Sequence, residues 1–225
     1  MFNRSLDTAF LVIFDFDGVL SNSKEAYANQ MLETLEFFSI TNITLEEVKA
    51  RVGNTDQTLD FIEFFQTNNQ ALIDSAMKKY VELTEKYAYQ RELFPGVIEI
   101  LEVLHKKNFL AIVSRKPQER MDYWLKHFNI THFFDIPIGT IENTKADAIK
   151  HIMGELKISK SRTIMVGDTE FDILSAKRAG VYSVLALYDA ADPENALKSE
   201  PDYCINKLSE IFDVIEKIKQ KNALI

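Results

Sequence analysis

The sequence predicts an α/β protein in which a parallel β-sheet is flanked by helices and interrupted by an all-helical insertion. First, residues 10–16 form a continuous stretch rich in β-branched and aromatic residues, typical of a strand buried on both faces. Second, residues 22–93 contain no comparable stretch and show helical patterns. Third, short strand and helix patterns alternate from residue 94 onward, which is typical of a parallel sheet wrapped by helices.

Length and composition agree with this division. At about 150 residues per domain, a chain of 225 residues suits one full domain plus an insertion. Hydrophobic residues at 46% and charged residues at 27% are ordinary for a globular protein and exclude a disordered or fibrous chain. We therefore expect residues 1–21 and 94–225 to form the α/β domain, and residues 22–93 to form a second, helical domain.

The insertion carries helix-start signals. Asn22 with Glu25, and Thr44 with Glu47, have the spacing of a capping box, so each pair predicts a helix N-terminus. Apolar residues at steps of three and four predict one buried face on the last helix of the insertion: Leu72, Ala76, Tyr80, Leu83 and Tyr87.

After the turn at residues 94–96, the α/β alternation resolves into separate elements. The patterns predict strands over residues 109–113, 136–138, 163–166 and 182–187. They predict helices over residues 118–128 and 145–156, and a further helix that ends at residue 179.

Charge, cysteine content and hydropathy exclude several classes of protein. The net charge is −8 and the basic clusters are no longer than pairs such as Lys78-Lys79, so nucleic acid is not an expected partner. The single cysteine, Cys204, cannot form an internal disulfide; we interpret it as a buried strand residue and expect a reducing, cytoplasmic location. The longest apolar run, residues 9–14, is far shorter than the ~20 residues that span a bilayer, so no membrane segment is expected.

Two acids follow the first strand. Side chains two positions apart share a face, so the carboxylates of Asp15 and Asp17 would lie roughly 6–7 Å apart. Such a pair repels itself unless a cation neutralises it or one acid is protonated, and carboxylate oxygens suit Mg²⁺. Gly18 allows a tight turn in which the backbone approaches a ligand. The alternative is a solvent-exposed strand end without a function.

Two further polar residues occupy positions where a phosphate could bind. Ser114 follows the strand over residues 109–113, and its hydroxyl could donate to a phosphate oxygen or cap the helix that begins near Pro117. Lys145 begins a helix, where the dipole disfavours a cation. It is either a solvated lysine or a group that reaches back to hold a phosphate and offset the carboxylates.

A second acidic pair follows the strand over residues 163–166. Asp168 lies at the strand end, and Asp172 projects from the first turn of the next helix on the same side. The alternative for Asp172 is a helix cap that interacts with the dipole.

Together these segments resemble the haloacid dehalogenase-like hydrolase superfamily. Its pattern is a strand ending in Asp-x-Asp-Gly, a strand ending in Ser or Thr, a distant Lys, and Gly-Asp followed by a further Asp. All four parts occur in order, as Asp15-Phe16-Asp17-Gly18, Ser114, Lys145, and Gly167-Asp168 with Asp172. The resemblance covers nearly the whole chain and implies a Rossmann-like core domain with an inserted helical cap domain.

The subgroup with a helical cap includes phosphoglycolate phosphatases and β-phosphoglucomutase. The dehalogenases lack the second acid, so Asp17 makes this sequence similar to the phosphatase branch. Two motifs depart from the phosphoglycolate phosphatase pattern. Thr-Asn-Lys-Pro is replaced by Ser-Arg-Lys-Pro at residues 114–117, and Lys145 precedes Ala146 where Pro is common. Neither departure removes a reacting group.

The resemblance implies roles for the motif residues. Asp15 would be the nucleophile that forms an aspartyl-phosphate, and Asp17 the general acid and base. Mg²⁺ would be bound by Asp15, the main-chain carbonyl of Asp17 and Asp168, with Asp172 as a further or outer ligand. Ser114 and Lys145 would bind the transferring oxygens.

The resemblance also suggests how the substrate is bound. The cap would close over the site, with a loop formed by Arg51 and residues 52–55 facing the substrate. We hypothesise that Arg51 or Arg115 contacts a second anionic or polar group, and that Gly18 and Lys116 also contribute to substrate binding. The alternative is that both arginines are solvated.

Three functions follow from these observations. The first is a Mg²⁺-dependent phosphatase acting on a small-molecule phosphate monoester. The second is a sugar phosphomutase that uses the same aspartyl-phosphate chemistry, and the third is a catalytically silent phosphate-binding module. The expected partner in each case is a small phosphate ester.

Overall fold

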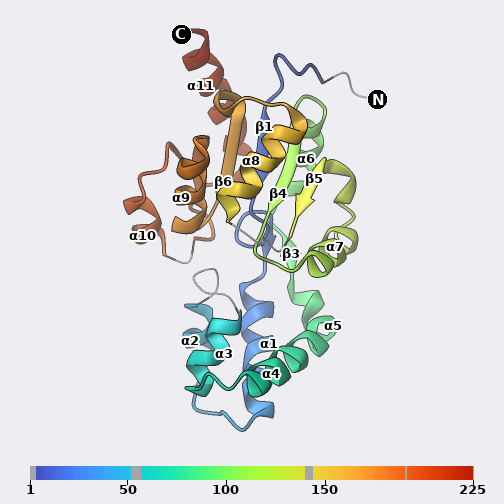
Figure 1. Ribbon diagram of the computed structural model, residues 1–225. Helices are drawn as coiled ribbons and strands as arrows, with labels where there is room; N and C mark the ends of the chain where they lie inside the picture. Colours follow the sequence, from blue (N-terminus) through green and yellow to red (C-terminus); the bar gives the residue numbers. More distant parts are fainter. Residues whose placement is uncertain (1–3, 52–56, 140–143, 191, 225) are drawn as a thin grey trace. The chain divides into compact units, whose positions relative to one another are not determined.

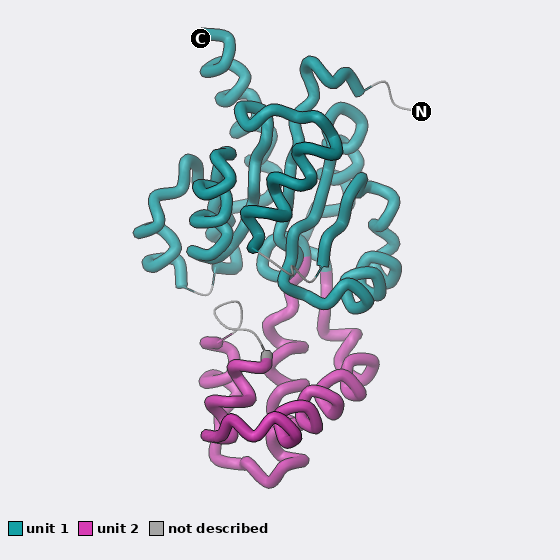
Figure 2. Tube along the Cα trace, viewed as in Figure 1, with its two compact units in different colours: residues 1–20, 93–225 teal, residues 21–92 magenta. Residues whose placement is uncertain are grey.

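The computed structural model describes residues 4–51, 57–139, 144–190 and 192–224. The chain divides into two compact units, coloured separately in Figure 2. Unit 1 comprises Met1–Leu20 and Leu93–Ile225, and unit 2 comprises Ser21–Glu92.

Unit 1 contains a six-stranded sheet with the order β5-β4-β1-β6-β7-β8. Every neighbouring pair of strands is parallel. The strands are β1 (Leu11–Phe14), β4 (Phe109–Val113), β5 (Ile136–Ile138), β6 (Thr163–Gly167), β7 (Tyr182–Ala186) and β8 (Tyr203–Ile205). The predicted fold class, a parallel Rossmann-like sheet flanked by helices, is therefore confirmed.

Helices cover both faces of this sheet, with α8 in front of it and α6 behind it in Figure 1. The α-helices of unit 1 are α6 (Val97–His105), α7 (Gln118–His127), α8 (Lys145–Leu156), α9 (Glu170–Ala179), α10 (Pro193–Lys198) and α11 (Ile211–Ala223). Its 3₁₀-helices are η2 (Thr131–Phe133), η3 (Lys160–Arg162) and η4 (Leu208–Glu210). All four residues of β1 are fully buried, because the strand is central and both of its faces are covered.

Unit 2 is helical and has a core of its own. Its helices are α1 (Lys24–Phe37), α2 (Leu45–Lys49), α3 (Gln57–Phe65), α4 (Gln70–Glu82), α5 (Thr84–Tyr87) and the 3₁₀-helix η1 (Ala88–Gln90). The short strands β2 (Ser21–Asn22) and β3 (Glu92–Leu93) pair with each other where the chain passes between the units. Met31, Phe61 and Tyr80 are fully buried in one apolar cluster.

Two predictions for unit 2 meet different outcomes. The capping box of Thr44 and Glu47 is present at the start of α2. The one predicted for Asn22 is wrong, because Asn22 lies in strand β2 and α1 begins at Lys24, after Ser23. Ala76, Tyr80 and Leu83 of the predicted apolar stripe are buried, but α4 ends at Glu82 and the stripe does not continue along one helix.

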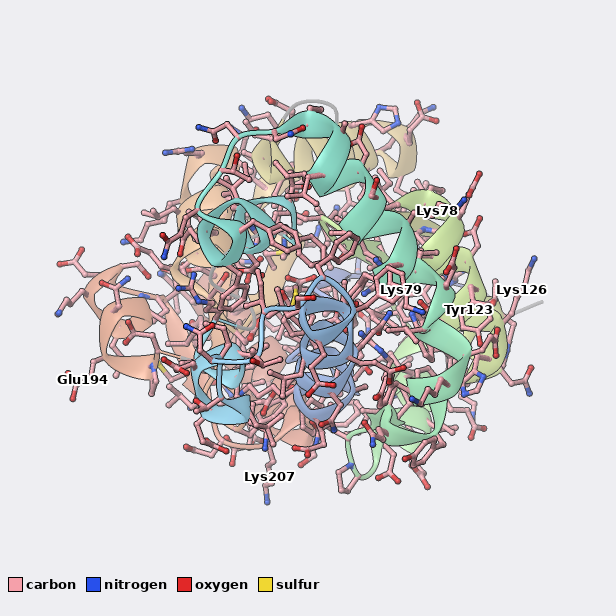
Figure 3. The ribbon with its side chains drawn as sticks, turned by 90° about the horizontal axis from the view of Figure 1, so that it is seen from below. Lys78, Lys79, Tyr123, Lys126, Glu194 and Lys207 are labelled. Carbon is pink, nitrogen blue, oxygen red and sulfur yellow. The ribbon has the colours of Figure 1, made fainter. Side chains whose placement is uncertain are left out.

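Cys204 and the lysine pair lie at surface positions. Cys204 is in strand β8, as the sequence suggests, but it is exposed, because β8 is the edge strand of the sheet. Lys78 and Lys79 project from α4 (Figure 3), and the Lys79 ammonium lies 4.8 Å from the centre of the Phe37 ring. Within the described ranges, none of the helices is both long and apolar enough to cross a lipid bilayer.

Candidate active site

The carboxyl ends of three adjacent strands bring the sequence motifs together. Asp15 follows β1, Ser114 follows β4 and Asp168 follows β6, and β1 lies between the other two. The amide of Asp15 donates to the carbonyl of Val166 at 2.9 Å, which continues the β1–β6 pairing by one residue. Because parallel strands end at one edge of a sheet, residues far apart in sequence meet there.

An acidic cluster lies at this edge. Asp15, Asp168 and Asp172 each offer a carboxylate oxygen, and these oxygens lie within 4.8 Å of one another. The ammonium of Lys145 donates to Asp15 Oδ2 and to Asp172 Oδ1, at 2.6 Å in each case. Lys145 therefore bridges two of the three acids, and it is buried, so the alternative of a solvated lysine is wrong.

Burial and mutual repulsion shape the protonation of this cluster. Burial raises the pKa of Asp15, the charge of Lys145 opposes that rise and the charge of Asp172 adds to it. Burial also raises the pKa of Asp168 well above its usual range, and the charges of Asp172 and Asp15 act in the same direction. For Lys145, burial alone would lower the pKa, but the charges of Asp15 and Asp172 raise it above its ordinary value. The cluster thus gathers more negative charge than one ammonium balances.

The residues present fit a divalent cation. Carboxylate oxygens are the ligands that Mg²⁺ prefers, and a cation would counter both the burial and the repulsion from neighbouring acids that raise the pKa of Asp168. Two glycines make room for the acids. A Cβ on Gly18, whose φ is +76°, would lie 2.1 Å from Asp168 Oδ2, and a Cβ on Gly167 would lie 2.1 Å from the Cβ of Asp172.

Asp172 combines the two interpretations that its sequence context allows. Its Oδ2 accepts from the hydroxyl of Thr169 at 2.6 Å and from the Thr169 amide at 3.2 Å, which ties it to the N-terminus of α9. Its Oδ1 accepts from Lys145. Asp172 is therefore a helix-capping residue and also a member of the acidic cluster.

Lys145 is placed by the start of α8. Thr144 precedes this helix, its hydroxyl accepts from the Asp147 amide at 3.2 Å, and its amide donates to the Asp147 carboxylate at 3.3 Å. This reciprocal cap fixes Lys145 as the first helical residue. A cation at this position is unfavourable for the helix dipole, and the carboxylates of Asp15 and the fully buried Asp172 compensate for it.

Ser114 and Lys116 form a compact turn after β4. Ser114 is buried, and its hydroxyl accepts from the amide of Lys116 at 3.2 Å. The alternative of Ser114 as a helix cap is wrong, because Pro117 is the cap residue of α7 and no side chain caps that helix. The ammonium of Lys116 lies 2.7 Å from Asp17 Oδ2, so the second acid of the first motif has its own cationic partner.

The two candidate arginines lie in different surroundings. The Arg115 guanidinium in unit 1 is 5.5 Å from the centre of the Phe171 ring. In unit 2, Arg51 forms an ion pair with Glu63, lies 4.6 Å from the centre of the Phe64 ring, and lines a pocket of about 570 Å³ together with both. Residues 52–55 of the expected substrate loop lie outside the described residues.

Sequence reasoning missed Tyr188. Its hydroxyl donates to the carbonyl of Val19 at 2.7 Å and so holds the turn that follows Gly18. Burial raises the pKa of Tyr188, and the charges of Asp168 and Asp189 raise it further. Tyr188 directly follows the predicted strand over residues 182–187. Because sites in open α/β sheets form at the carboxyl ends of strands, its position could have marked it as a candidate.

Fold and site together define an α/β protein with an acidic centre at the carboxyl edge of its parallel sheet. The chain belongs to the haloacid dehalogenase-like hydrolases, whose family model matches residues 12–186. This span contains every predicted site residue, and membership confirms the resemblance stated from the motifs and the expectation of a hydrolase.

Relatives and solved structures extend this result. A phosphoglycolate phosphatase from Vibrio vulnificus is 30% identical over 217 residues, covering 91% of this chain and 95% of the relative. A pyrophosphatase PpaX from Halalkalibacterium halodurans is 26% identical over 219 residues, with the same coverage of both chains. The structure of a haloacid dehalogenase-like hydrolase from Streptococcus pneumoniae is similar in fold, with a TM-score of 0.81 at 24% identity, covering 92% of this chain and 99% of that one.

Proposed function

We propose that this protein is a Mg²⁺-dependent phosphatase that hydrolyses a small-molecule phosphate monoester through an aspartyl-phosphate on Asp15. The observation that carries the proposal is the cluster of Asp15, Asp168 and Asp172 around Lys145 at the carboxyl edge of the sheet. Membership of a hydrolase family and the phosphatase names of the relatives support it. The cytoplasmic location expected from the sequence remains a prediction.

The acids divide into metal ligands and reacting groups. Asp15, Asp168 and the main-chain carbonyl of Asp17 would hold Mg²⁺, with Asp172 as a further or outer ligand. When bound there, the ion supplies the positive charge that lets a carboxylate approach an anionic phosphate.

Asp15 carries the first half of the reaction. Its carboxylate oxygen attacks phosphorus, a P–O bond forms to Asp15, and the ester P–O bond breaks. Two contacts orient the attacking group: Lys145 donates to Asp15 Oδ2 at 2.6 Å, and the Phe16 amide donates to Asp15 Oδ1 at 2.6 Å. The charge of Lys145 favours the ionised carboxylate that the attack requires, against the effect of burial.

Asp17 moves the protons. Its carboxyl group protonates the departing oxygen, and the resulting carboxylate then takes a proton from water as that water attacks the phosphorus of the aspartyl-phosphate. The bond between phosphorus and Asp15 breaks, which releases inorganic phosphate and restores Asp15. The Asp17 side chain is one-third exposed, in keeping with a group that must reach both substrate and water.

Ser114 and Lys145 bind the transferring oxygens. The Ser114 hydroxyl can donate to one phosphate oxygen while it accepts from the Lys116 amide. Lys145 offers three donors, two of which are used by Asp15 and Asp172. Charge-assisted bonds of this kind act most strongly where water is excluded.

Unit 2 is proposed as the cap domain that contacts the leaving group, and residues 1–21 with 94–225 as the catalytic domain. Arg51 and Arg115 are the candidates to bind a second anionic or polar group on the substrate, and Gly18 lets the backbone approach the phosphate. Phosphoglycolate and pyrophosphate, the substrates named for the relatives, each carry a second anionic group.

The test is a panel of phosphate monoesters assayed for inorganic phosphate release with Mg²⁺. We expect turnover of at least one small ester and its loss when a chelator removes the metal. Asp15→Asn should lower kcat on the order of 10³-fold or more, because the nucleophile is lost. The matched control is Asp213→Asn, which changes an exposed acid on α11 and should leave kcat unchanged.

Three results would contradict the proposal. Turnover that persists in excess chelator would show that the reaction does not depend on a metal. A wild-type kcat in Asp15→Asn would show that Asp15 is not the nucleophile. No phosphate release from any ester would favour a silent phosphate-binding module, or a phosphomutase if a hexose phosphate is isomerised instead.

A further inference from the structure

We propose that Lys116 is a positioning residue that binds one oxygen of the Asp17 carboxyl group, Oδ2, and so orients the group for proton transfer between its other oxygen and the leaving group. This inference rests on the proposed function, in which Asp17 is the general acid and base. It assigns Lys116 a role that acts through Asp17, in place of the substrate contact expected from the sequence.

The contact itself is short and charge-assisted. The ammonium of Lys116 lies 2.7 Å from Asp17 Oδ2. An N–H⁺···O⁻ bond of this length is stronger than a neutral hydrogen bond and restricts the direction of both side chains.

The two partners differ in burial. The Lys116 side chain is 5% exposed, whereas the Asp17 side chain is 33% exposed. A carboxylate that is partly open to solvent has several rotamers available, and each has a different direction for its oxygens. The buried partner is therefore the fixed one, and Asp17 is the group that it orients.

Several contacts fix Lys116 in turn. Its amide donates to the Ser114 hydroxyl at 3.2 Å, and its ammonium lies 5.9 Å from the centre of the Phe16 ring. The chain at Gly139 passes so close that a Cβ there would lie 2.5 Å from the Lys116 carbonyl oxygen. The backbone of Lys116 is thus held from two sides before its side chain reaches Asp17.

The site therefore pairs each acid of the first motif with its own buried lysine. Lys145 contacts Asp15 from the start of α8, and Lys116 contacts Asp17 from the turn after β4. This division separates the orientation of the nucleophile from the orientation of the acid. A misplaced general acid slows proton transfer without preventing nucleophilic attack, and this difference can be measured.

The experiment compares two leaving groups in the full-length enzyme with Mg²⁺. An alkyl phosphate from the panel needs a proton on its departing oxygen, whereas 4-nitrophenyl phosphate releases a stabilised phenolate that needs little help. The value of kcat/KM reports only steps up to the first irreversible one, so it isolates attack and departure from hydrolysis of the aspartyl-phosphate.

Lys116→Met keeps the length of the side chain and removes its charge. We expect kcat/KM for the alkyl ester to fall about 10- to 100-fold, less than the roughly 10²- to 10⁴-fold contribution of general acid catalysis because Asp17 itself remains. We expect kcat/KM for 4-nitrophenyl phosphate to fall less than about threefold. Lys116→Arg retains a cation and should recover part of the loss for the alkyl ester. The matched control is Lys107→Met, an exposed lysine of unit 1, which should behave as wild type.

A double variant separates action through Asp17 from a direct role. Asp17→Asn should show the same leaving-group selectivity, and adding Lys116→Met to it should cause no further loss, because the positioned group is already gone. Equal losses for both esters, an additive double variant, or no loss with Lys116→Met would each overturn the inference. If Lys116→Met does not fold, kcat/KM for the two esters is compared in Lys116→Gln and Lys116→Arg instead.

The failure of the inference and the failure of the proposed function give different results. If Asp17→Asn is selective for the alkyl ester and Lys116→Met is not, only the role of Lys116 is lost. If wild type releases no phosphate, or Asp17→Asn affects both esters equally, the proposed function or the role of Asp17 within it is lost.

Discussion

At the scale of single residues, Asp168 shows how burial and neighbouring charge act on one carboxyl group. Asp168 is only 5% exposed. Burial is the largest cause that raises its pKa well above the ordinary 3.8, and the charges of Asp172 and Asp15 raise it further. The folded protein therefore holds a proton on Asp168 at pH values where the unfolded chain has lost it. The contribution of Asp168 to the free energy of unfolding consequently falls as the pH rises from about 3.8 to the raised pKa. Above this pH window, the metal-free protein keeps the full destabilisation.

Asp168→Asn should stabilise the metal-free protein at pH 7.5, because the amide keeps the size of the side chain and removes a carboxyl group whose ionised form is disfavoured by burial and by the charges of Asp172 and Asp15. We expect Tm to rise by about 2 °C or more, and the gain to shrink as the pH is lowered into the window. Differential scanning calorimetry with and without Mg²⁺ provides the measurement. Mg²⁺ should raise the Tm of wild type more than that of the variant.

Asp7→Asn serves as the control, since this acid is exposed in a turn of unit 1 outside the helices, and the Tm of this variant should match wild type at each pH. A variant less stable than wild type at pH 7.5 without metal would show that Asp168 is held by favourable contacts and not under repulsion.

At the scale of elements, two helices begin with the same reciprocal cap in different surroundings. In α8, Thr144 pairs with Asp147, whose side chain is 51% exposed, and in α9 Thr169 pairs with Asp172, which is fully buried. The local hydrogen bonds match, since the threonine hydroxyl lies 2.7 Å from the Asp147 carboxylate and 2.6 Å from the Asp172 carboxylate. The two caps therefore separate the contribution of a cap from that of a buried ion pair.

Asp147→Ala should lower the free energy of unfolding by about 0.5 kcal/mol, the size of an exposed acid at a helix N-terminus. Asp172→Ala should cost about 3 kcal/mol, because Lys145 keeps Asp15 but loses a second buried carboxylate. Urea denaturation of the metal-free variants at pH 7.5 measures both. Equal losses would mean that Asp172 acts only as a cap and that its bond to Lys145 adds nothing to stability.

Element bounds were predictable where a local pattern determines them. The strands β4 and β5 and the helix α8 begin and end at the predicted residues, because each apolar run or cap is complete within its own segment. Asn22 failed as a cap because it pairs with β3, about 70 residues away, and a local spacing rule carries no information about such a partner.

The sequence could predict which strand ends of the candidate site come together, but not which side chains pair with each other. Sites in open α/β sheets form at the carboxyl ends of strands, which selects Asp15, Ser114 and Asp168. These residues do follow adjacent strands at one edge of the sheet. The contacts of Lys145 with Asp172 and of Lys116 with Asp17 depend on how separate elements direct their side chains, and no spacing within one segment encodes that. The same reason explains why Tyr188, which holds the turn after Gly18, was missed.

At the scale of the whole molecule, the chain forms two units with separate apolar cores. In unit 1, Ile13, Ile149 and other residues of β1 and α8 form one buried cluster. In unit 2, Phe61 and Tyr80 belong to another. The chain passes between the units only at residues 20–21 and 92–93. All proposed metal ligands belong to unit 1, so metal binding should stabilise that unit directly.

Calorimetry of the full chain should therefore resolve two transitions, since chains with several cores often depart from two-state unfolding. Mg²⁺ at about 100 times its dissociation constant should stabilise one transition by about 2.7 kcal/mol and leave the other in place. Ile149→Ala should lower the Mg²⁺-sensitive transition and Phe61→Ala the insensitive one, each by about 2–5 kcal/mol, because each substitution leaves a cavity in one fully buried core. Calorimetry could instead show a single transition that Mg²⁺ and both variants shift. The two cores would then unfold cooperatively, and metal binding in unit 1 would also stabilise unit 2.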